Sequence, residues 1–177
     1  TYTLNFAYGS GIAVEGAGFL LNNEMDDFSA KPGSANGYGL IGGTANAIQP
    51  KKRPLSSMTP TILFDSNNKP LLATGTPGGS TIITIVLQII LNWAEFGMGI
   101  AEATAAPRIH HQWLPDEVYY EKGISQDSLY NLRSMGHYIQ LKSRVLGSTQ
   151  SIALKGKLLE GSADSRRHGA AAISQKP

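Results

Sequence analysis

The sequence predicts an α+β fold in which antiparallel sheets are covered by helices. Two observations lead to this prediction: predicted strands outnumber helices, and turn residues join the strands into hairpins. Strands joined by short turns pair antiparallel, and their apolar face must be covered by another layer. With 177 residues and 41% hydrophobic composition, we expect a single domain over residues 1–177.

The N-terminal part of the chain predicts two strands and then a long loop. Residues 1–6 alternate polar with apolar or aromatic side chains, which is typical of a half-buried strand that ends in the turn-like residues 8–11. Residues 18–22 form the second strand candidate. From residue 29 to residue 54 the chain is rich in Gly, Pro, Asn and Ala, and loops of that length are usually functional.

The central part predicts a hairpin and a buried helix. Residues 61–64 and 71–74 flank residues 65–68, which are Asp-Ser-Asn-Asn and favour a tight turn. Residues 82–91 are apolar nearly all round, so we expect a helix that is buried on most sides, although the many β-branched residues also allow a strand. Because glycines and a proline interrupt residues 70–94, a buried helix fits better than a membrane span.

The C-terminal part predicts one amphipathic helix and a second hairpin. Ser125 is a helix N-cap, Leu129 and Leu132 form an apolar face, and Gly136 follows the last turn. The alternating residues 150–154 and 157–162 then pair as a hairpin.

Composition excludes several classes of function. Fifteen basic against 13 acidic residues give a net charge of +2, which is too small to recruit nucleic acid or an anionic membrane. The absence of cysteine excludes disulfides, thiolate metal sites and a cysteine nucleophile. Charged residues make up only 16% of the chain, which indicates that a partner covers part of the surface. Because the chain starts at Thr1 without a signal peptide, we expect a processed or truncated product.

A metal site is not expected. His110 and His111 are adjacent and point in different directions, and no carboxylate–histidine spacing matches them. We therefore assign them a structural or surface role.

Four segments, in their order and spacing, resemble the small subunit of gamma-glutamyltranspeptidases: TYTLN at 1–5, LLNNEMDDFS at 20–29, KRPLSSM at 52–58 and PGGS at 77–80. APR at 106–108, WLPDE at 113–117 and GSADSR at 161–166 extend the resemblance over nearly the whole chain. Each motif alone is weak, because sequences such as Pro-Gly-Gly-Ser occur in many loops. Their shared order is what identifies the family.

The resemblance implies the four-layer αββα sandwich of N-terminal-nucleophile hydrolases. It also implies a large subunit that is released from the same precursor by self-cleavage and completes the sheets. The implied location is outside the cytoplasm, periplasmic or secreted. No metal or organic cofactor is implied.

The resemblance also assigns a binding site for a gamma-glutamyl group, which is a zwitterion with an amide at its far end. Glu24 and Asp27, beside Asn5, match the pocket for the substrate ammonium, for which charge-assisted hydrogen bonds are suited. A solvated acidic loop is the ordinary alternative for such residues. Ser56 and Ser57 match the donors to the α-carboxylate, together with an arginine of the large subunit; for an isolated Ser-Ser pair, a local turn would be the alternative.

The catalytic residues follow from the same motifs. Gly78 and Gly79 match the oxyanion hole, since adjacent glycines let backbone N–H groups approach a tetrahedral intermediate, although a plain strand-to-helix turn has the same geometry. The family's nucleophile is an N-terminal Thr whose own amine serves as base. Thr1 matches a position downstream of that nucleophile, and Thr3 matches the residue whose hydroxyl supports it. We therefore expect that this chain alone is inactive.

Three functional hypotheses remain. The first is a gamma-glutamyl transferase and glutathione hydrolase, which takes glutathione and other gamma-glutamyl compounds as donors and amino acids or peptides as acceptors. The second is an acylase of the same family for glutaryl-cephalosporin-like amides, which lack the α-ammonium; the intact ammonium and carboxylate residues disfavour it. The third is a non-catalytic fragment or scaffold without the nucleophile segment.

Overall fold

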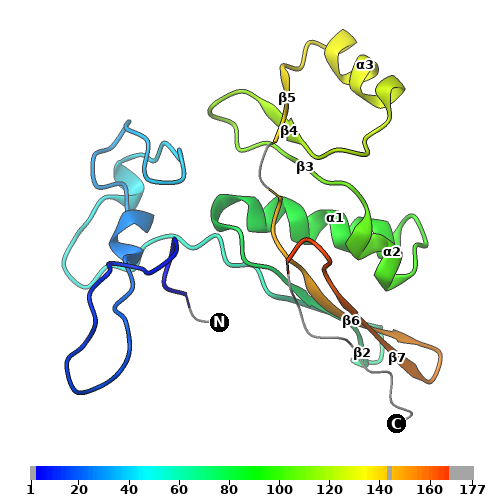
Figure 1. Ribbon diagram of the computed structural model, residues 1–177, viewed down its shortest axis with the longest axis horizontal. Coiled ribbons are helices and arrows are strands. Elements are labelled where there is room, and N and C mark those ends of the chain that lie inside the picture. The colour runs from blue at the N-terminus through cyan, green and yellow to red at the C-terminus, as the bar shows by residue number, and fades with distance from the viewer. Residues whose placement is uncertain (1–2, 143–144, 168–177) are drawn as a thin grey trace. The chain divides into compact units, whose positions relative to one another are not determined.

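In the computed structural model, which describes residues 3–142 and 145–167, two hairpins that are far apart in the sequence join into one sheet (Figure 1). The predicted first hairpin is confirmed as β1 (Thr61–Phe64) and β2 (Pro70–Gly75), and the second as β6 (Gln150–Lys155) and β7 (Leu158–Ala163). The strand order is β1-β2-β6-β7, and every neighbouring pair is antiparallel.

The register of this sheet separates a covered face from an open one. Leu72 lies opposite Ala153 in the β2–β6 pair, and both side chains are buried. The preceding residue of β6, Ile152, points to the other face and is exposed, as is Ile62 on β1. Since side chains alternate along a strand, the sheet presents an apolar face that no described element covers.

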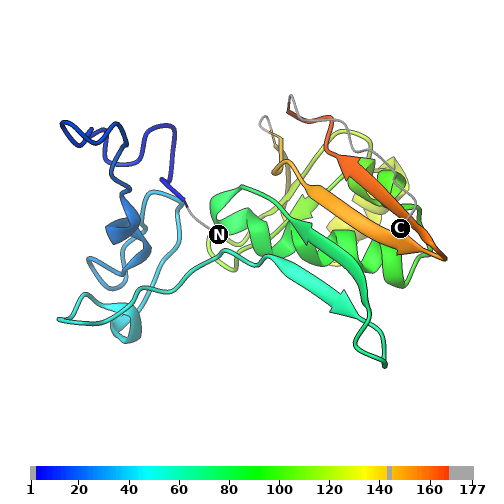
Figure 2. The same ribbon diagram turned by 90° about the horizontal axis from the view of Figure 1, so that it is seen from below.

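Two helices cover the other face, and both views show them against the sheet (Figures 1 and 2). The 3-10 turn η3 (Gly79–Thr81) leads into α1 (Ile82–Ala94), and α2 (Ile100–Ala105) follows. The core between helices and sheet contains Leu72, Ile89, Ile100 and Ala153.

The predicted helix over residues 82–91 is confirmed by α1, but its burial on most sides is not. Ile85 and Ile89 are fully buried against the sheet, whereas Ile83 is 50% and Leu87 is 52% exposed. These two exposed residues are four apart and therefore lie on one face of the helix, turned away from the sheet. In the described part of the chain, α1 is buried on one side only.

A smaller sheet lies farther along the chain and was not predicted. It contains β3 (Ile109–His110), β4 (Val118–Tyr120) and β5 (Ile139–Leu141), and its β4–β5 pair is parallel. The predicted amphipathic helix is confirmed as α3 (Gln126–Ser134), which packs through Leu129 on Val118 and Ile139. Ser125 caps it by accepting a hydrogen bond from the Ser128 N–H at 3.1 Å.

The residues cluster into two compact units, Thr1–Ser57 and Met58–Pro177, and each is described by itself. The first contains the turns η1 (Glu24–Asp27) and η2 (Thr44–Asn46). The predicted loop over residues 29–54 is confirmed: η2 is its only regular element, beside one isolated bridge between Ala35 and Ile41.

Both strand predictions in the first unit are wrong for the residues that the structure describes. Residues 3–5 have no regular structure and residues 6–10 form turns, because Asn5 and Phe6 take left-handed backbone conformations with φ of 59° and 50°. Residues 1–2 of that prediction lie outside the described residues. At residues 18–22 only an isolated bridge from Leu20 to Ala13 forms.

The predicted α+β class is confirmed, with an antiparallel main sheet and helices on one of its faces. In the described ranges, no helix is long and apolar enough to cross a membrane.

Candidate active site

The acidic turn η1 organises the first unit. The Asn22 side chain accepts a hydrogen bond from the Glu24 N–H at 3.1 Å, which starts the turn. One Asp26 carboxylate oxygen accepts from the Gly37 N–H at 2.9 Å, and the Asp26 carbonyl accepts from the Asn36 side chain at 3.0 Å. These bonds tie the loop over residues 36–38 to the turn.

Asn5 brings three predicted site residues together. Its side-chain amide donates to an Asp27 carboxylate oxygen at 3.4 Å, and its backbone N–H donates to the Thr3 hydroxyl at 3.2 Å. The Tyr38 hydroxyl donates to the side-chain carbonyl of Asn5 at 2.8 Å, which fixes the orientation of the amide. Thr3, Asn5 and Asp27 therefore form one hydrogen-bonded group, and Tyr38 is a member that the sequence did not reveal.

The backbone beneath this group is strained. A left-handed conformation is tolerated by Asn5 but is unusual for a bulky residue such as Phe6. Phe6 is held there by stacking on Tyr38, with ring centroids 5.0 Å apart and an interplanar angle of 18°. Strain of this kind costs roughly 1–3 kcal/mol and collects at functional sites.

The electrostatics of Glu24 single it out. Burial, a hydrogen bond with Asp27 and repulsion by that carboxylate together raise the pKa of Glu24 to about 7, although a hydrogen bond with Thr3 acts in the opposite direction. The Glu24 Oε1 atom is buried and has no hydrogen-bond partner among the described residues. In the described part of the chain neither carboxylate forms an ion pair, and a bound cation would supply the counter-charge.

Ser56 and Ser57 lie at the end of the same unit, in a segment without regular secondary structure. Asn46 connects this segment to the acidic turn: its side-chain amide donates to the Asp27 carbonyl at 2.7 Å, and its side-chain carbonyl accepts from the Leu55 N–H at 3.0 Å. Asn46 was missed because only its place in the long loop marked it. It links Leu55, the residue before Ser56, to the backbone of Asp27.

Gly78 and Gly79 lie in the second unit, so the structure does not by itself bring them to the acidic group. Both have positive φ, 155° and 58°, which favours glycine. A Cβ on Gly78 would also stand 2.6 Å from the Thr81 Oγ1 atom. Within the described residues, no backbone carbonyl accepts a hydrogen bond from the N–H of either glycine.

The two histidines have separate partners. His110 is buried, with its Nδ1 atom 2.8 Å from the Thr84 hydroxyl and its Nε2 atom 3.0 Å from Gln112 Oε1. His111 is exposed and lies 3.0 Å from Asp116. Across the described parts of the chain, no three or more His, Asp or Glu side chains are placed to hold a metal ion.

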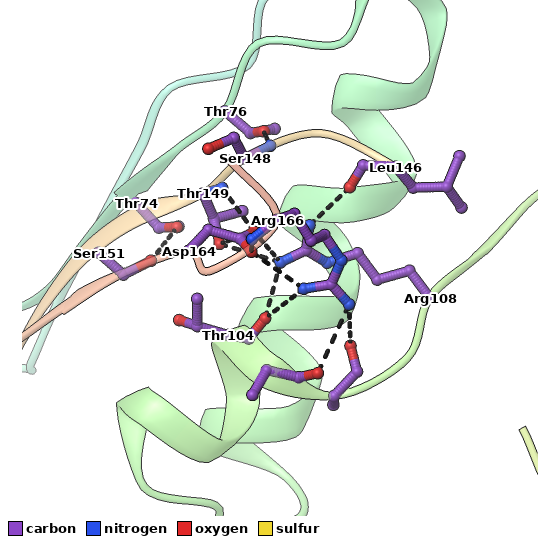
Figure 3. Close-up of polar contacts among 12 residues, drawn as sticks. Thr74, Thr76, Thr104, Arg108, Leu146, Ser148, Thr149, Ser151, Asp164 and Arg166 are labelled. Carbon is purple, nitrogen blue, oxygen red and sulfur yellow. Dashed lines mark hydrogen bonds and ion pairs between the residues drawn. The ribbon is translucent and has the colours of Figure 1, made fainter. Parts of the chain in front are cut away.

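A buried charge network in the second unit was also missed by the sequence (Figure 3). Arg108 pairs with Asp164 at 2.7 Å, and Arg166 pairs with both Asp164 at 3.1 Å and Glu121 at 2.7 Å. The sequence marked the segments of Arg108, Asp164 and Arg166 only as motifs. Because Arg108 and Asp164 are 56 residues apart, no local pattern could pair them.

The structure thus has a mixed α+β fold, an acidic hydrogen-bonded group around Asn5 in the first unit, and a glycine pair at the start of a helical turn in the second. A family model for gamma-glutamyltranspeptidase matches residues 1–174. The chain belongs to the gamma-glutamyltranspeptidase family, and its predicted relation to the N-terminal-nucleophile hydrolases is confirmed.

Individual relatives agree. The chain is 59% identical over 152 residues to the glutathione hydrolase proenzyme of Escherichia coli strain K12. The matched residues cover 86% of this chain and 26% of that protein. It is similar to the gamma-glutamyltranspeptidase of Pseudomonas nitroreducens complexed with L-DON, with a TM-score of 0.89, 45% identity and coverage of 98% of this chain and 91% of that chain. A Helicobacter pylori gamma-glutamyltranspeptidase T380A mutant gives a TM-score of 0.89 at 55% identity, with coverage of 94% and 91%.

The chain spans about a quarter of the E. coli proenzyme, 26%, and 31% of the corresponding proenzyme of Pseudomonas aeruginosa.

Proposed function

We propose that this chain forms the small-subunit part of a gamma-glutamyl transferase and glutathione hydrolase. The observation that carries the proposal is the carboxylate pair of Glu24 and Asp27 beside Asn5, with a raised Glu24 pKa and a buried oxygen that has no partner among the described residues. Such a pair fits the α-ammonium of a gamma-glutamyl group. Glutathione and other gamma-glutamyl amides are therefore the proposed donors, and amino acids or peptides the acceptors.

The rest of the substrate is assigned to the remaining predicted residues. The hydroxyls of Ser56 and Ser57 would donate to the α-carboxylate, with an arginine of the large subunit as its cationic partner. This arrangement would set negative charge beside the ammonium and positive charge beside the carboxylate, the two charged groups on the α-carbon. An amide substrate without the ammonium would leave the carboxylate pair unpaired, which argues against the glutaryl acylase.

The chemistry we propose is acyl transfer through a covalent intermediate. The proposed nucleophile is an N-terminal Thr upstream of Thr1. It attacks the gamma-carbonyl, and the N–H groups of Gly78 and Gly79 stabilise the oxyanion. Thr3 supports the nucleophile through its hydroxyl. Collapse of the intermediate expels the amine and leaves a gamma-glutamyl-enzyme, which water or an acceptor amine then resolves.

The large subunit is proposed as the partner that covers the open apolar surfaces. Ile62, Phe64 and Ile152 are between 54% and 56% exposed on one face of the main sheet. A second sheet packed there would complete the αββα sandwich and bury these side chains. The location outside the cytoplasm, periplasmic or secreted, stays a prediction from the resemblance.

Covalent labelling tests the proposed nucleophile. Acivicin, incubated with the intact protein that contains this chain, is expected to label a Thr upstream of Thr1 and to abolish hydrolysis of gamma-glutamyl-p-nitroanilide. Peptide mapping by mass spectrometry locates the label. A label on the Thr1 Oγ atom would overturn the alignment of the N-terminal segment, and an unlabelled, active protein would overturn the covalent mechanism.

The raised Glu24 pKa predicts a pH dependence of substrate binding. Below about pH 7 Glu24 takes up a proton, so one negative charge facing the ammonium is lost as the pH falls. We expect this titration to lower kcat/KM for gamma-glutamyl-p-nitroanilide by roughly 10-fold from pH 8 to pH 6. Glu24→Gln is the control, because it keeps the shape but cannot titrate. Identical pH profiles for the two proteins would contradict the assignment.

A further inference from the structure

We propose that the hydroxyls of Thr76 and Thr81 are positioning groups that aim the N–H groups of Gly78 and Gly79 at the reacting carbonyl oxygen. The inference rests on the proposed function, which assigns those N–H groups to the oxyanion. It adds two residues to which the family motif gave no role.

A hydrogen bond from Thr76 orients the peptide that joins Pro77 to Gly78. The Thr76 hydroxyl donates to the Pro77 carbonyl oxygen at 2.8 Å. This peptide is trans and planar, so its C=O and the Gly78 N–H point in opposite directions in one plane. A hydrogen bond that fixes the Pro77 carbonyl therefore also fixes the direction of the Gly78 N–H.

The next peptide is held in the same way from the other side. The Gly78 carbonyl accepts from the Thr81 hydroxyl at 2.9 Å and from the Thr81 N–H at 3.2 Å. That carbonyl belongs to the same peptide as the Gly79 N–H. The hydroxyls of Thr76 and Thr81 thus fix two successive peptide planes, whose N–H groups are the two proposed oxyanion donors.

Thr76 is itself held by the loop before β6 (Figure 3). The Thr76 hydroxyl oxygen accepts from the Ser148 N–H at 2.8 Å, which leaves its hydrogen to donate to Pro77. Gly147 lies directly against this point: a Cβ there would stand 2.5 Å from Thr76 Oγ1 and 3.1 Å from the Pro77 carbonyl. The fit allows no side chain at residue 147.

The buried charge network holds both ends of that loop. Arg108 donates to the Leu146 carbonyl at 2.6 Å, and Glu121 accepts from the Leu146 N–H at 2.9 Å. At the other end, Asp164 accepts from the Thr149 N–H at 2.9 Å. The chain of contacts therefore runs from fixed charges through the loop to Thr76 and then to the Gly78 N–H.

A plain strand-to-helix turn would need one of these bonds at most. The Thr81 bond alone resembles an ordinary cap at the start of a short helical turn, but the Thr76 bond lies outside the helix and closes no turn. Its effect is on the orientation of one peptide. An oxyanion hole depends on donors that are aimed before the reaction begins, so orientation is what catalysis would require here.

The test compares Thr76→Val and Thr81→Val with Thr76→Ser and Thr81→Ser in the intact, processed enzyme. Valine removes the hydroxyl and keeps the shape, whereas serine keeps the hydroxyl. With active sites counted by acivicin titration, we expect each valine variant to lose roughly 10- to 100-fold in kcat on gamma-glutamyl-p-nitroanilide, with KM changed by less than about threefold. We expect the serine variants to stay within about threefold of wild type.

Thr61→Val is the matched control, since the Thr61 hydroxyl makes a similar local bond, to the Thr59 carbonyl at 3.0 Å, in a strand. Valine variants at 76 and 81 with wild-type kcat would overturn the inference. Serine variants as impaired as the valine variants would also overturn it. If a valine variant does not mature, the kcat of the matching serine variant against wild type decides. A wild-type enzyme without gamma-glutamyl turnover would instead remove the proposed function, and this inference with it.

Discussion

Replacing Asp27 with Ala in the intact enzyme is expected to lower kcat/KM for gamma-glutamyl-p-nitroanilide by roughly 10- to 100-fold. A hydrogen bond to a charged group is worth about 1.5–3 kcal/mol, and the substrate ammonium would lose one such bond. The Asn5 amide loses its Asp27 acceptor as well, but its side-chain carbonyl keeps the hydrogen bond from the Tyr38 hydroxyl. Initial rates over a range of substrate concentrations measure the effect.

Two controls separate the ammonium contact from a general loss of structure. Asp116→Asn removes a carboxylate charge from the exposed surface, where its partner is His111, and is expected to keep wild-type efficiency. Turnover of glutaryl-p-nitroanilide, which lacks the ammonium, is expected to change by less than about threefold in Asp27→Ala. Equal losses on both anilides, or no loss on either, would refute the assignment of Asp27.

The second large effect is expected on stability, from Asp164→Asn. The network balances Arg108 and Arg166 against Glu121 and Asp164, and the neutral amide leaves one buried positive charge in excess. Breaking a buried ion pair in this way costs about 3–5 kcal/mol of the free energy of unfolding. By the scaling for a domain of about 150–250 residues, this corresponds to a fall in the melting temperature of roughly 6–20 °C, which calorimetry can measure.

The pKa of Asp164 sets the pH range of this effect. Burial alone would raise the pKa, but hydrogen bonds from the Arg166 and Thr149 N–H groups and the Arg108 guanidinium lower it from 3.8 to about 2. The stabilisation is therefore fully present above about pH 3.8 and is lost as the pH falls through about 2. The deficit of Asp164→Asn should accordingly be constant from pH 5 to pH 8.

Glu160→Gln is the matched control for the network, because Glu160 pairs with the exposed Lys155 at 3.5 Å. An exposed pair contributes only about 0–1 kcal/mol, so the melting temperature should fall by no more than about 4 °C. An Asp164→Asn protein as stable as Glu160→Gln would contradict the role given to the network.

The fold was predictable where the signal was local. Turn residues at 65–68 and alternation in residues 150–162 predicted both hairpins, and Ser125 and Gly136 predicted the ends of α3. Residues 3–6 alternate equally well, yet two left-handed residues prevent a strand, and no pattern of hydrophobicity reports φ. The strands β3 to β5 are too short, at two or three residues each, to alternate visibly.

The candidate site divides in the same way. Asn5, Glu24 and Asp27 were chosen by family resemblance, and the structure places them in one unit where Asn5 contacts Asp27 and Glu24 interacts with it. Tyr38 and Asn46 complete this group from a loop whose sequence has no periodicity. Tyr38 is 33 residues from its partner Asn5, and Asn46 is 19 residues from its partner Asp27. Only the tertiary structure brings residues so far apart in the sequence into contact.

Recognition of the α-ammonium of a gamma-glutamyl group by Glu24 and Asp27, as we propose, is tested most directly by comparing two substrates. The measurement is the ratio of kcat/KM for gamma-glutamyl-p-nitroanilide and glutaryl-p-nitroanilide in the intact wild-type enzyme, since these substrates differ only in the ammonium. We expect a preference of at least about 10- to 100-fold for the gamma-glutamyl substrate. Equal efficiency, or a preference for the glutaryl substrate, would contradict it.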